Sequence, residues 1–421
     1  MRIYIKTFGC TANKADSLRM RQLLTAEGHT FTDTEDSAEM VLVNTCTVTC
    51  TTQRHVLKYI RSVSGSGKQV TVAGCLSAAQ PETLKDINCR IIIPSSLEDI
   101  INITGDEGNE TDITPDSGNA IPLIEEVTGI VSISQGCVGH CSYCIVRQAR
   151  GELISRSIPE IVQEVRSMIA SGAKELQLSS QDISAYGLDT GVRLPELLKA
   201  LNAIDGDHMI RVGMMNPFTI LDIVDEVADA FKETHIFKFL HLPIQSGSER
   251  VLESMNRKHT VDEFKLIVQA FREMFPSIIL STDFIVGYPT ETNEDFNATL
   301  ELLENIKPQK VNITRYSPRP NTPASLLYDM PDRFKKERSR VLTNSHHDLT
   351  RAILQSKIGE QTRILTTHAG KNNSTVGRDN YYNMVAVREN LPLGEWHNVT
   401  IVDSTITYLI GEVQKEEQTN K

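Results

Sequence analysis

Apolar stretches of strand length alternate with helix-like segments throughout residues 1–104. Strands are predicted at 2–8, 40–45, 69–73 and 90–93, longer helices at 14–27 and 51–63, and a short helix at 81–86. Alternation of this kind is typical of an α/β fold in which helices cover the faces of a parallel sheet.

The same alternation occurs six times between residues 127 and 330. Strands are predicted at 130–134, 175–180, 209–214, 237–243, 278–285 and 310–316. Two of the intervening helices begin with a capping-box pattern, Ser157 with Glu160 and Thr260 with Glu263. Six strand–helix units predict an incomplete (β/α) barrel, and a doubly wound sheet is the alternative.

The remaining segments differ in character and suggest the domain boundaries. Residues 105–126 begin with a polar stretch and are expected to be a linker, whereas the charged, helix-like segment 331–352 completes a central domain at 127–352. Residues 355–415 alternate between polar and apolar positions, with Gly and Asn between the runs, which predicts a small all-β barrel or sandwich. A polar tail is expected at 416–421, after a first domain at 1–104.

Composition narrows the functional classes. The formal net charge is −11, which excludes a strongly basic coat for nucleic acid but leaves room for a local basic face. We find neither an apolar run of membrane-spanning length nor a signal-peptide core, so we expect a cytoplasmic protein without a membrane partner. Eight cysteines are too few for a disulfide scaffold and indicate metal or redox chemistry instead.

Three cysteines follow the first strand of the expected barrel. Cys137, Cys141 and Cys144 form a C-x3-C-x2-C loop, here called the loop trio. It lies at the strand end where barrel enzymes place their chemistry. Three thiolates favour an iron–sulfur cluster in which one iron of a four-iron cube stays open for a ligand. A structural zinc site with His140 as a fourth ligand, or three incidental cysteines, is the alternative.

A second set of cysteines emerges from position in the predicted sheet. Cys10, Cys46 and Cys75, here called the upstream trio, each come just after a predicted strand of the first domain. The carboxyl ends of parallel strands share one edge, so these thiols could converge on a second cluster. Three small buried residues are the alternative. We expect Cys50 and Cys89 to bind no metal, because Cys89 precedes its strand and Cys50 begins the following helix.

Ordered motifs accompany the cysteines along nearly the whole chain. They are Thr7-Phe8-Gly9-Cys10 with Asn13 and Asp16-Ser17, Val43-Asn44-Thr45-Cys46, Gly74-Cys75, Tyr143-Cys144-Ile145-Val146, Ala149-Arg150-Gly151, Gln181-Asp182, Tyr186-Gly187, Pro243-Ile244-Gln245-Ser246-Gly247-Ser248, Thr282-Asp283, Val286-Gly287-Tyr288-Pro289 and Arg319-Pro320-Asn321-Thr322-Pro323. With them the sequence resembles the radical S-adenosylmethionine (SAM) methylthiotransferase family. The resemblance implies a flavodoxin-like N-terminal domain, a partial (β/α)6 radical SAM barrel and a small C-terminal TRAM barrel that contacts RNA.

The resemblance also implies cofactors and a reaction. It implies two [4Fe–4S] clusters, one on each trio, with SAM bound at the loop trio and sulfur supplied at the upstream trio. The residues around the loop trio resemble the archaeal and eukaryotic branch, which converts N6-threonylcarbamoyladenosine (t6A) at tRNA position 37 to its 2-methylthio derivative. Implied partners are the tRNA anticodon loop and an electron donor, a ferredoxin or flavodoxin-like protein.

Other functions stay open at this point. The same family includes enzymes that act on prenylated adenosine-37 of tRNA or on an aspartate of a ribosomal protein. A radical SAM enzyme with one cluster and a non-catalytic two-cluster electron-transfer protein are further alternatives.

Several residues are weaker candidates for ligand contact. Tyr143 could flank the SAM adenine or simply pack in the core. Gln245 and Asp283, at predicted strand ends, could contact SAM or substrate or cap the strands. Arg150 and Arg257 could bind the SAM carboxylate or an RNA phosphate, or could be solvated surface residues.

The charge of the expected C-terminal barrel does not by itself favour RNA binding. Residues 361–413 carry four basic and five acidic side chains, although phosphate contacts usually demand positive charge. Aromatic stacking on bases could compensate, and the basic side chains near the end of the barrel could add charge. The residues concerned are Tyr381, Tyr382 and Trp396 for stacking, and Arg315, Arg319 and the basic positions of 333–340 for charge.

Overall fold

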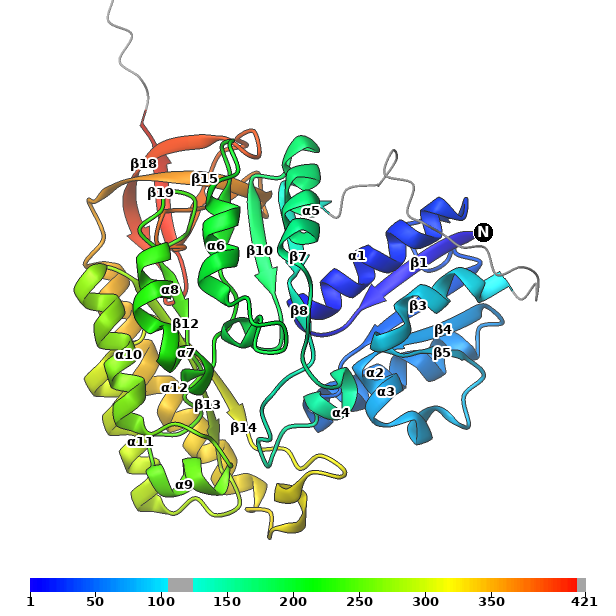
Figure 1. Ribbon diagram of the computed structural model, residues 1–421, viewed down its shortest axis with the longest axis horizontal. Coiled ribbons are helices and arrows are strands. Elements are labelled where there is room, and N and C mark those ends of the chain that lie inside the picture. The colour runs from blue at the N-terminus through cyan, green and yellow to red at the C-terminus, as the bar shows by residue number, and fades with distance from the viewer. Residues whose placement is uncertain (105–123, 415–421) are drawn as a thin grey trace, which may run out of the picture.

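The computed structural model describes residues 1–104 and 124–414. Three units pack together: the N-terminal sheet in blue and cyan, the central barrel in green and yellow, and a small barrel in orange and red (Figure 1). Helix α1 (Thr11–Ala26) of the first unit packs against β7 (Thr128–Ser132) and β10 (Glu175–Ser179) of the central barrel. The N-terminal unit therefore lies beside one edge of the barrel.

The N-terminal unit is a doubly wound sheet. Its five strands are all parallel, in the order β2-β1-β3-β4-β5. This is the flavodoxin-like order, in which ligands bind where the strand order reverses, between β1 and β3. The strands are β1 (Arg2–Thr7), β2 (Thr30–Phe31), β3 (Met40–Thr45), β4 (Gln69–Gly74) and β5 (Arg90–Ile92).

Helices cover both faces of this sheet, as the sequence predicts. On one face, Met20 and Leu24 of α1 pack on Leu42, together with the 3-10 segment η2 (Pro94–Thr104). On the other, Val56 and Ile60 of α2 (Cys50–Ser64) join α3 (Cys75–Ala79) and η1 (Pro81–Leu84). The sequence pattern does not predict β2 or α3. β2 has two residues and α3 has five, too few for a periodic pattern to be recognised.

The central unit is an open barrel of six parallel strands. β7 pairs with β10 and β10 with β11 (Met209–Arg211); β12 (Phe239–His241) pairs with β13 (Ile279–Val286) and β13 with β14 (Lys310–Arg315). A single parallel bridge between Ile210 and Ile236 connects the two halves. Among the described strands no pairing joins β14 to β7, which confirms the incomplete barrel and excludes the doubly wound alternative for this unit.

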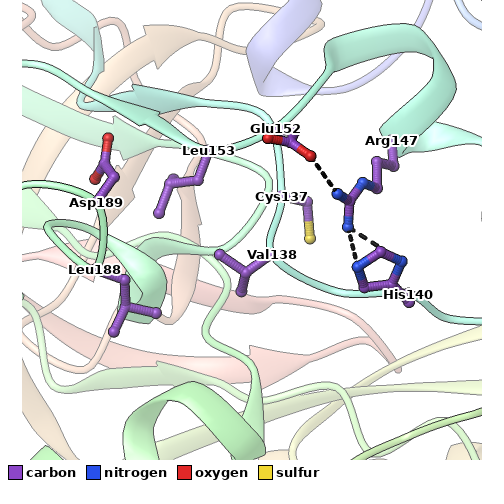
Figure 2. A pocket seen from close by; sticks show the side chains of 8 residues that line it. All are labelled: Cys137, Val138, His140, Arg147, Glu152, Leu153, Leu188 and Asp189. Carbon is purple, nitrogen blue, oxygen red and sulfur yellow. Dashed lines mark hydrogen bonds and ion pairs between the residues drawn. The ribbon is translucent and has the colours of Figure 1, made fainter.

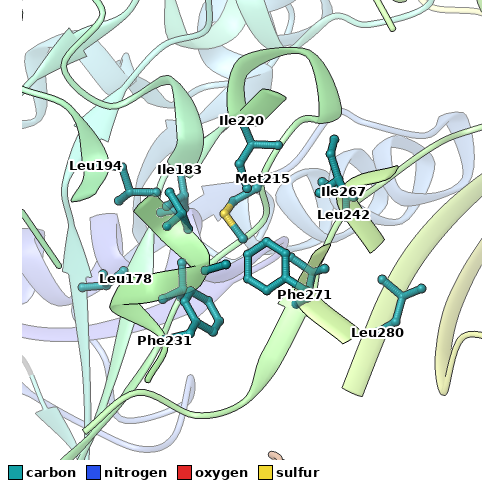
Figure 3. Packing of buried hydrophobic residues seen from close by; sticks show 14 of the residues in the cluster. Leu178, Ile183, Leu194, Met215, Ile220, Phe231, Leu242, Ile267, Phe271 and Leu280 are labelled. Atoms are coloured by element: carbon teal, nitrogen blue, oxygen red, sulfur yellow. The ribbon is translucent and has the colours of Figure 1, made fainter. Parts of the chain in front are cut away.

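The helices of the central unit surround the strands. They are α5 (Ile158–Ala170), α6 (Leu194–Asn202), α7 (Pro217–Ile220), α8 (Val224–Ala230), α9 (Glu249–Ser254), α10 (Val261–Met274) and α11 (Asn293–Ile306), with short 3-10 turns η3 (Ile183–Ala185), η4 (Leu221–Ile223) and η5 (Pro323–Leu326). Leu178, Phe231, Phe271 and Leu280 fill the layer between helices and strands (Figure 3). Both predicted capping boxes are present, at the starts of α5 and α10.

Two short strand pairs flank the barrel. β6 (Ile124–Glu125) runs antiparallel to β7, and β8 (Ser134–Gln135) pairs with β9 (Ile154–Ser155). Of the predicted linker 105–126, residues 105–123 fall outside the described part of the chain, and β6 occupies two of the last three positions. The predicted tail 416–421 falls outside it as well.

The last unit is a closed five-stranded barrel in the order β15-β16-β17-β19-β18. Its strands are β15 (Gln361–Ala369), β16 (Thr375–Arg378), β17 (Met384–Val387), β18 (Trp396–Ser404) and β19 (Leu409–Val413), and the 24-residue helix α12 (Asp332–Gln355) leads into it. Leu365 and Tyr382 pack on Phe237, Phe239 and Ile279. The small barrel thus closes the amino-terminal end of the central barrel, opposite the strand ends that precede the loop trio.

Within residues 1–104 and 124–414, no helix combines the length and the apolar composition that a membrane span requires.

Candidate functional site

The upstream trio converges at the switch point of the N-terminal sheet. Cys10 caps α1 after β1, Cys46 follows β3, and Cys75 begins α3 after β4. Burial raises the pKa values of Cys46 and Cys75, and each is raised further by the neighbouring thiols of the trio. Gly74 has φ +95°, and a Cβ there would lie 2.6 Å from the Thr45 carbonyl oxygen, so only glycine lets β4 turn into α3 here.

Two buried asparagines connect the backbone segments that carry Cys10 and Cys46. The Asn13 amide donates to Asn44 Oδ1 and to the Thr45 carbonyl, both at 3.1 Å. In return, the Asn44 amide donates to the Asn13 carbonyl at 2.7 Å. The Cys10 thiol donates to Asn13 Oδ1 at 3.5 Å. The first turn of α1 is thereby attached to the end of β3, which holds Cys10 near Cys46.

The loop trio lies between β8 and α4 (Val146–Arg150). Backbone N–H groups donate to two of its sulfurs, Gly139 to Cys137 at 3.2 Å and Val146 to Cys144 at 3.4 Å. Arg257 Nη1 donates to the third, Cys141, at 3.5 Å. Burial raises the pKa of the Cys144 thiol to about 12, so this thiol needs a metal to become a thiolate at neutral pH. Donors aimed at sulfur would stabilise the thiolate form.

Neither trio has the geometry of a structural zinc site. A structural zinc needs four ligands around one ion, and among the described residues no three His, Cys, Asp or Glu side chains are close enough to hold one ion. The His140 ring, the expected fourth zinc ligand, instead hydrogen-bonds to Arg147 (Figure 2). A four-iron cube, by contrast, takes each of three thiolates on a different iron.

Arg150 connects the two trios. It ends α4, the helix that follows the loop trio, and α4 packs against α3, which begins at Cys75. Its guanidinium forms a 2.6 Å ion pair with Asp16 and also hydrogen-bonds to the Cys75 thiol. The Arg150 side chain is only 3% exposed. The expectation that Arg150 binds a SAM carboxylate or RNA phosphate, or is solvated, is therefore wrong, because N-terminal partners occupy it.

Arg319 forms a second connection between the central and N-terminal units. Fully buried, it donates to Thr47 Oγ1 at 2.9 Å, to Gln80 Oε1 at 2.6 Å and to the Cys50 sulfur at 3.2 Å. Arg319 is thus unavailable to RNA, contrary to expectation. Cys50 is part of this interface, where its thiol also donates to the Pro318 carbonyl at 3.5 Å.

Polar side chains gather in the interior of the barrel. Asp283 Oδ1 accepts from Asn312 Nδ2 at 2.6 Å and from His241 Nε2 at 3.2 Å, so Asp283 is more than a strand-end cap. Gln245 has a left-handed φ of +79°, and its carbonyl accepts from Ile285 N–H while its own N–H donates to Asp283 O. Both half-buried residues therefore belong to the carboxyl half of the barrel interior, although Asp283 lies within β13 and not at its end.

Arg257 and Tyr143 border the loop trio. Besides contacting Cys141, Arg257 donates to Asn216 Oδ1 at 3.1 Å and to the Pro243 carbonyl at 3.0 Å, so it is not a solvated surface residue. Tyr143 packs with Tyr288 and Tyr316, and burial raises its pKa well above the usual range. Most of the Tyr143 side chain is therefore packed in the core. Its contact with the loop trio is a hydrogen bond to Cys141.

A cavity of about 310 Å³ opens beside Cys137 of the loop trio. Cys137, Val138 and Leu188 line it, together with the Arg147–Glu152 ion pair, whose N–O distance is 2.8 Å (Figure 2). This cavity places Cys137 beside open space.

Comparison with known proteins identifies the family. A probable threonylcarbamoyladenosine tRNA methylthiotransferase of Archaeoglobus fulgidus is 40% identical over 99% of this chain and 100% of its own length. The human threonylcarbamoyladenosine tRNA methylthiotransferase is 32% identical over 98% of this chain and 74% of its own. The chain belongs to the threonylcarbamoyladenosine tRNA methylthiotransferase family. It is therefore an enzyme, a transferase of the radical SAM superfamily.

Matches to individual family models follow the same three units. Residues 2–93 match the uncharacterized protein family UPF0004, residues 131–303 the radical SAM superfamily, and residues 355–414 the TRAM domain. The solved structure of a radical SAM methyltransferase, TsrM from Kitasatospora setae, superposes with a TM-score of 0.56 at 14% identity, covering 83% of this chain and 89% of that one. This likeness supports the fold alone.

The small barrel of this methylthiotransferase family member has fewer free RNA-contact residues than the sequence suggests. Tyr382 is buried against the central barrel, and its hydroxyl donates to Glu175 at 2.7 Å. Trp396 Nε1 donates to Asp207 of the central barrel at 2.9 Å. Stacking of Tyr382 on a base is therefore excluded by its burial, and Trp396 serves first as an interdomain contact.

The basic helix α12 also offers less charge than expected. Lys335 and Arg338 are buried, in ion pairs with Asp329 and Glu291 respectively. Arg315 pairs with Asp332 at 3.2 Å. Much of the positive charge on this segment is thus used to hold the barrel together.

Proposed function

We propose that this family member converts N6-threonylcarbamoyladenosine at position 37 of tRNA into its 2-methylthio derivative. The observation that carries the proposal is the connection of two cysteine trios through one buried arginine, Arg150. Sulfur insertion at adenine C2 needs a radical source and a sulfur source close together, and a single-cluster enzyme would need only the loop trio. The printed names of the full-length relatives supply the substrate.

The proposal gives each trio a cluster. Cys137, Cys141 and Cys144 would hold one [4Fe–4S] cluster and SAM, and the upstream trio would hold a second [4Fe–4S] cluster. When bound, these groups supply a carbon-centred radical, sulfur and a methyl group, which no side chain can provide. The protein's own contribution is placement and exclusion of water.

The chain's own residues would perform that placement. Arg257, held by Asn216 and the Pro243 carbonyl, would fix the position of Cys141 through its hydrogen bond to the sulfur. Asp283 and Gln245 present polar groups to a ligand in the carboxyl half of the barrel. An adenine in a single-stranded loop can leave its stack and enter the barrel at a cost of a few kcal/mol, roughly. The electron donor, a ferredoxin or flavodoxin-like protein, and the cytoplasmic location stay predictions.

Nucleoside analysis of tRNA tests the proposal. We expect 2-methylthio-t6A in tRNA from cells that carry the gene and unmodified t6A in cells that lack it, as read by mass spectrometry. A Cys46→Ala variant should fail to restore the modified nucleoside. The matched control is Cys89→Ala, because Cys89 lies at the opposite edge of the sheet. Persistence of 2-methylthio-t6A without the gene, or methylthio transfer to a ribosomal protein instead, would refute the proposal.

A further inference from the structure

Three cations surround two aromatic rings at the amino-terminal end of the central barrel, here called its floor. The Arg211 guanidinium carbon lies 5.2 Å from the centre of the Phe239 ring, and Lys310 Nζ lies 5.0 Å from the same point. Arg378, from the small barrel, lies 4.6 Å from the centre of the Tyr382 ring, and Lys310 lies 5.1 Å from it. One site is thus built jointly by the central and C-terminal units.

In the described part of the chain, none of these cations is paired directly with a carboxylate, although Glu175 and Asp379 lie near enough to act on Lys310. Within the described residues, none of Arg211, Lys310 and Arg378 forms an ion pair, whereas most buried charges are paired. Nε of both arginines is buried without a hydrogen-bond partner. Glu175, the carboxylate beside them, accepts instead from the Tyr382 hydroxyl and from Gln177, both at 2.7 Å.

The three positive charges of this cluster repel one another. Burial and the charges of Arg378 and Arg211 lower the pKa of Lys310 to about 7, and Asp379 and Glu175 oppose that shift only in part. Within the part of the chain that the structure describes, the Lys310 ammonium donates one hydrogen bond, to the Tyr382 carbonyl oxygen at 3.1 Å. An anion placed among the three side chains would relieve the repulsion and satisfy the free donors.

Strand alternation directs two of the cations into the barrel interior. On β11, Ile210 and Val212 pack outward among the helices, so Arg211 between them points inward. On β14, Val311 and Ile313 pack outward, which leaves Lys310 and Asn312 facing inward. Lys310 therefore lies one strand repeat, roughly 7 Å, below Asn312 and its partner Asp283.

We propose that Arg211, Lys310 and Arg378 bind the carboxylate of the threonylcarbamoyl group when the substrate base enters the barrel from its carboxyl end. This inference rests on the proposed function and adds the means of substrate selection. The threonyl unit carries a carboxylate that unmodified adenosine lacks, and guanidinium groups pair well with carboxylates. A site left with unpaired cations rejects the base that cannot fill it. The small barrel would then select substrate through Arg378.

The test compares two RNA hairpins on the holoenzyme, one with t6A and one with unmodified adenosine at position 37. We expect Arg211→Gln and Lys310→Met each to weaken binding of the t6A hairpin by about 10- to 100-fold and to leave binding of the adenosine hairpin unchanged. Arg166→Gln is the matched control, because Arg166 is an exposed cation of the outer helix α5. It should change neither affinity.

A second arm keeps the test independent of variant folding. A hairpin whose t6A carboxylate is masked as a methyl ester should bind the wild-type enzyme as weakly as the t6A hairpin binds the variants. Equal losses for both hairpins would assign the cations to a backbone phosphate and overturn the proposal, as would full affinity for the ester. If wild-type enzyme fails to methylthiolate the t6A hairpin at all, the proposed function itself fails.

Discussion

Replacing Arg150 with Gln should weaken the contact between α4, which follows the loop trio, and the N-terminal unit that carries the upstream trio. The Arg150–Asp16 pair is buried, with side chains 3% and 11% exposed. Losing one partner of a buried pair costs about 3–5 kcal/mol, because the other charge is left uncompensated. With an unfolding entropy of about 2.1 cal/mol/K for each residue, 421 residues give a drop in melting temperature of roughly 3–6 °C if the chain unfolds as one unit.

The loss should depend on pH. Burial raises the pKa of Asp16, and Arg150 opposes that rise through its charge and hydrogen bond. Without Arg150 the pKa of Asp16 in the folded protein rises further, so the carboxyl takes up a proton more readily. The stability deficit is therefore greatest at neutral pH and shrinks as the pH falls and Asp16 becomes protonated. Asp16→Asn combined with Arg150→Gln should recover most of the lost stability.

Thermal unfolding of the cluster-loaded enzyme at pH 5.5 and pH 7.5 measures both effects. Arg147→Gln is the matched control on the same helix, because its partner Glu152 is 83% exposed and such surface pairs contribute at most about 1 kcal/mol. Arg150→Gln should also shift the reduction potential of the cluster assigned to Cys75, since a donor to its sulfur is lost. An Arg150→Gln protein as stable as wild type at pH 7.5, or equally destabilised in the double variant, contradicts the reasoning.

Three further outcomes follow from the contacts between units. Cys50→Ser should leave the iron content unchanged, as measured by a colorimetric iron assay, because the Cys50 sulfur is engaged at the interface and not in a trio; loss of half the iron would make it a ligand. Tyr382→Phe should lower the free energy of unfolding by about 1–3 kcal/mol in a urea titration, because Glu175 loses its hydroxyl donor inside the protein; no change would mean that water replaces the donor freely. Asp207→Ala should red-shift the fluorescence of Trp396, the only tryptophan, as the small barrel loosens, and an unchanged spectrum would show that the hydrogen bond does not hold it.

The cysteine positions were predictable because topology constrains them. Once the alternating pattern predicts parallel strands, residues that follow those strands must share an edge, which is how Cys10, Cys46 and Cys75 could be grouped although 65 positions separate the first from the last. Six strand–helix units likewise predicted the open barrel. Strand ends differ by a few residues, because hydrogen bonding and apolar patterning do not stop at the same position.

Contacts between units were not predictable from local pattern. Arg150 and Asp16 are 134 positions apart, and a single arginine after a cysteine loop is equally consistent with a ligand contact, a phosphate contact or a salt bridge. Arg319 and Tyr382 illustrate the same limit, since both types are usually exposed or interfacial. Nothing in the alternation of 355–415 indicates which end of the central barrel it covers. Burial of Tyr382 therefore reversed its expected role.

Iron quantification tests the central claim, that the two trios each hold a four-iron cluster, most directly. After anaerobic reconstitution and removal of unbound iron, the wild-type chain should contain about eight iron atoms, and a Cys10→Ala, Cys46→Ala, Cys75→Ala variant should contain about four while still cleaving SAM when reduced. About four iron atoms in the wild type, or no loss of iron in the triple variant, would contradict the claim.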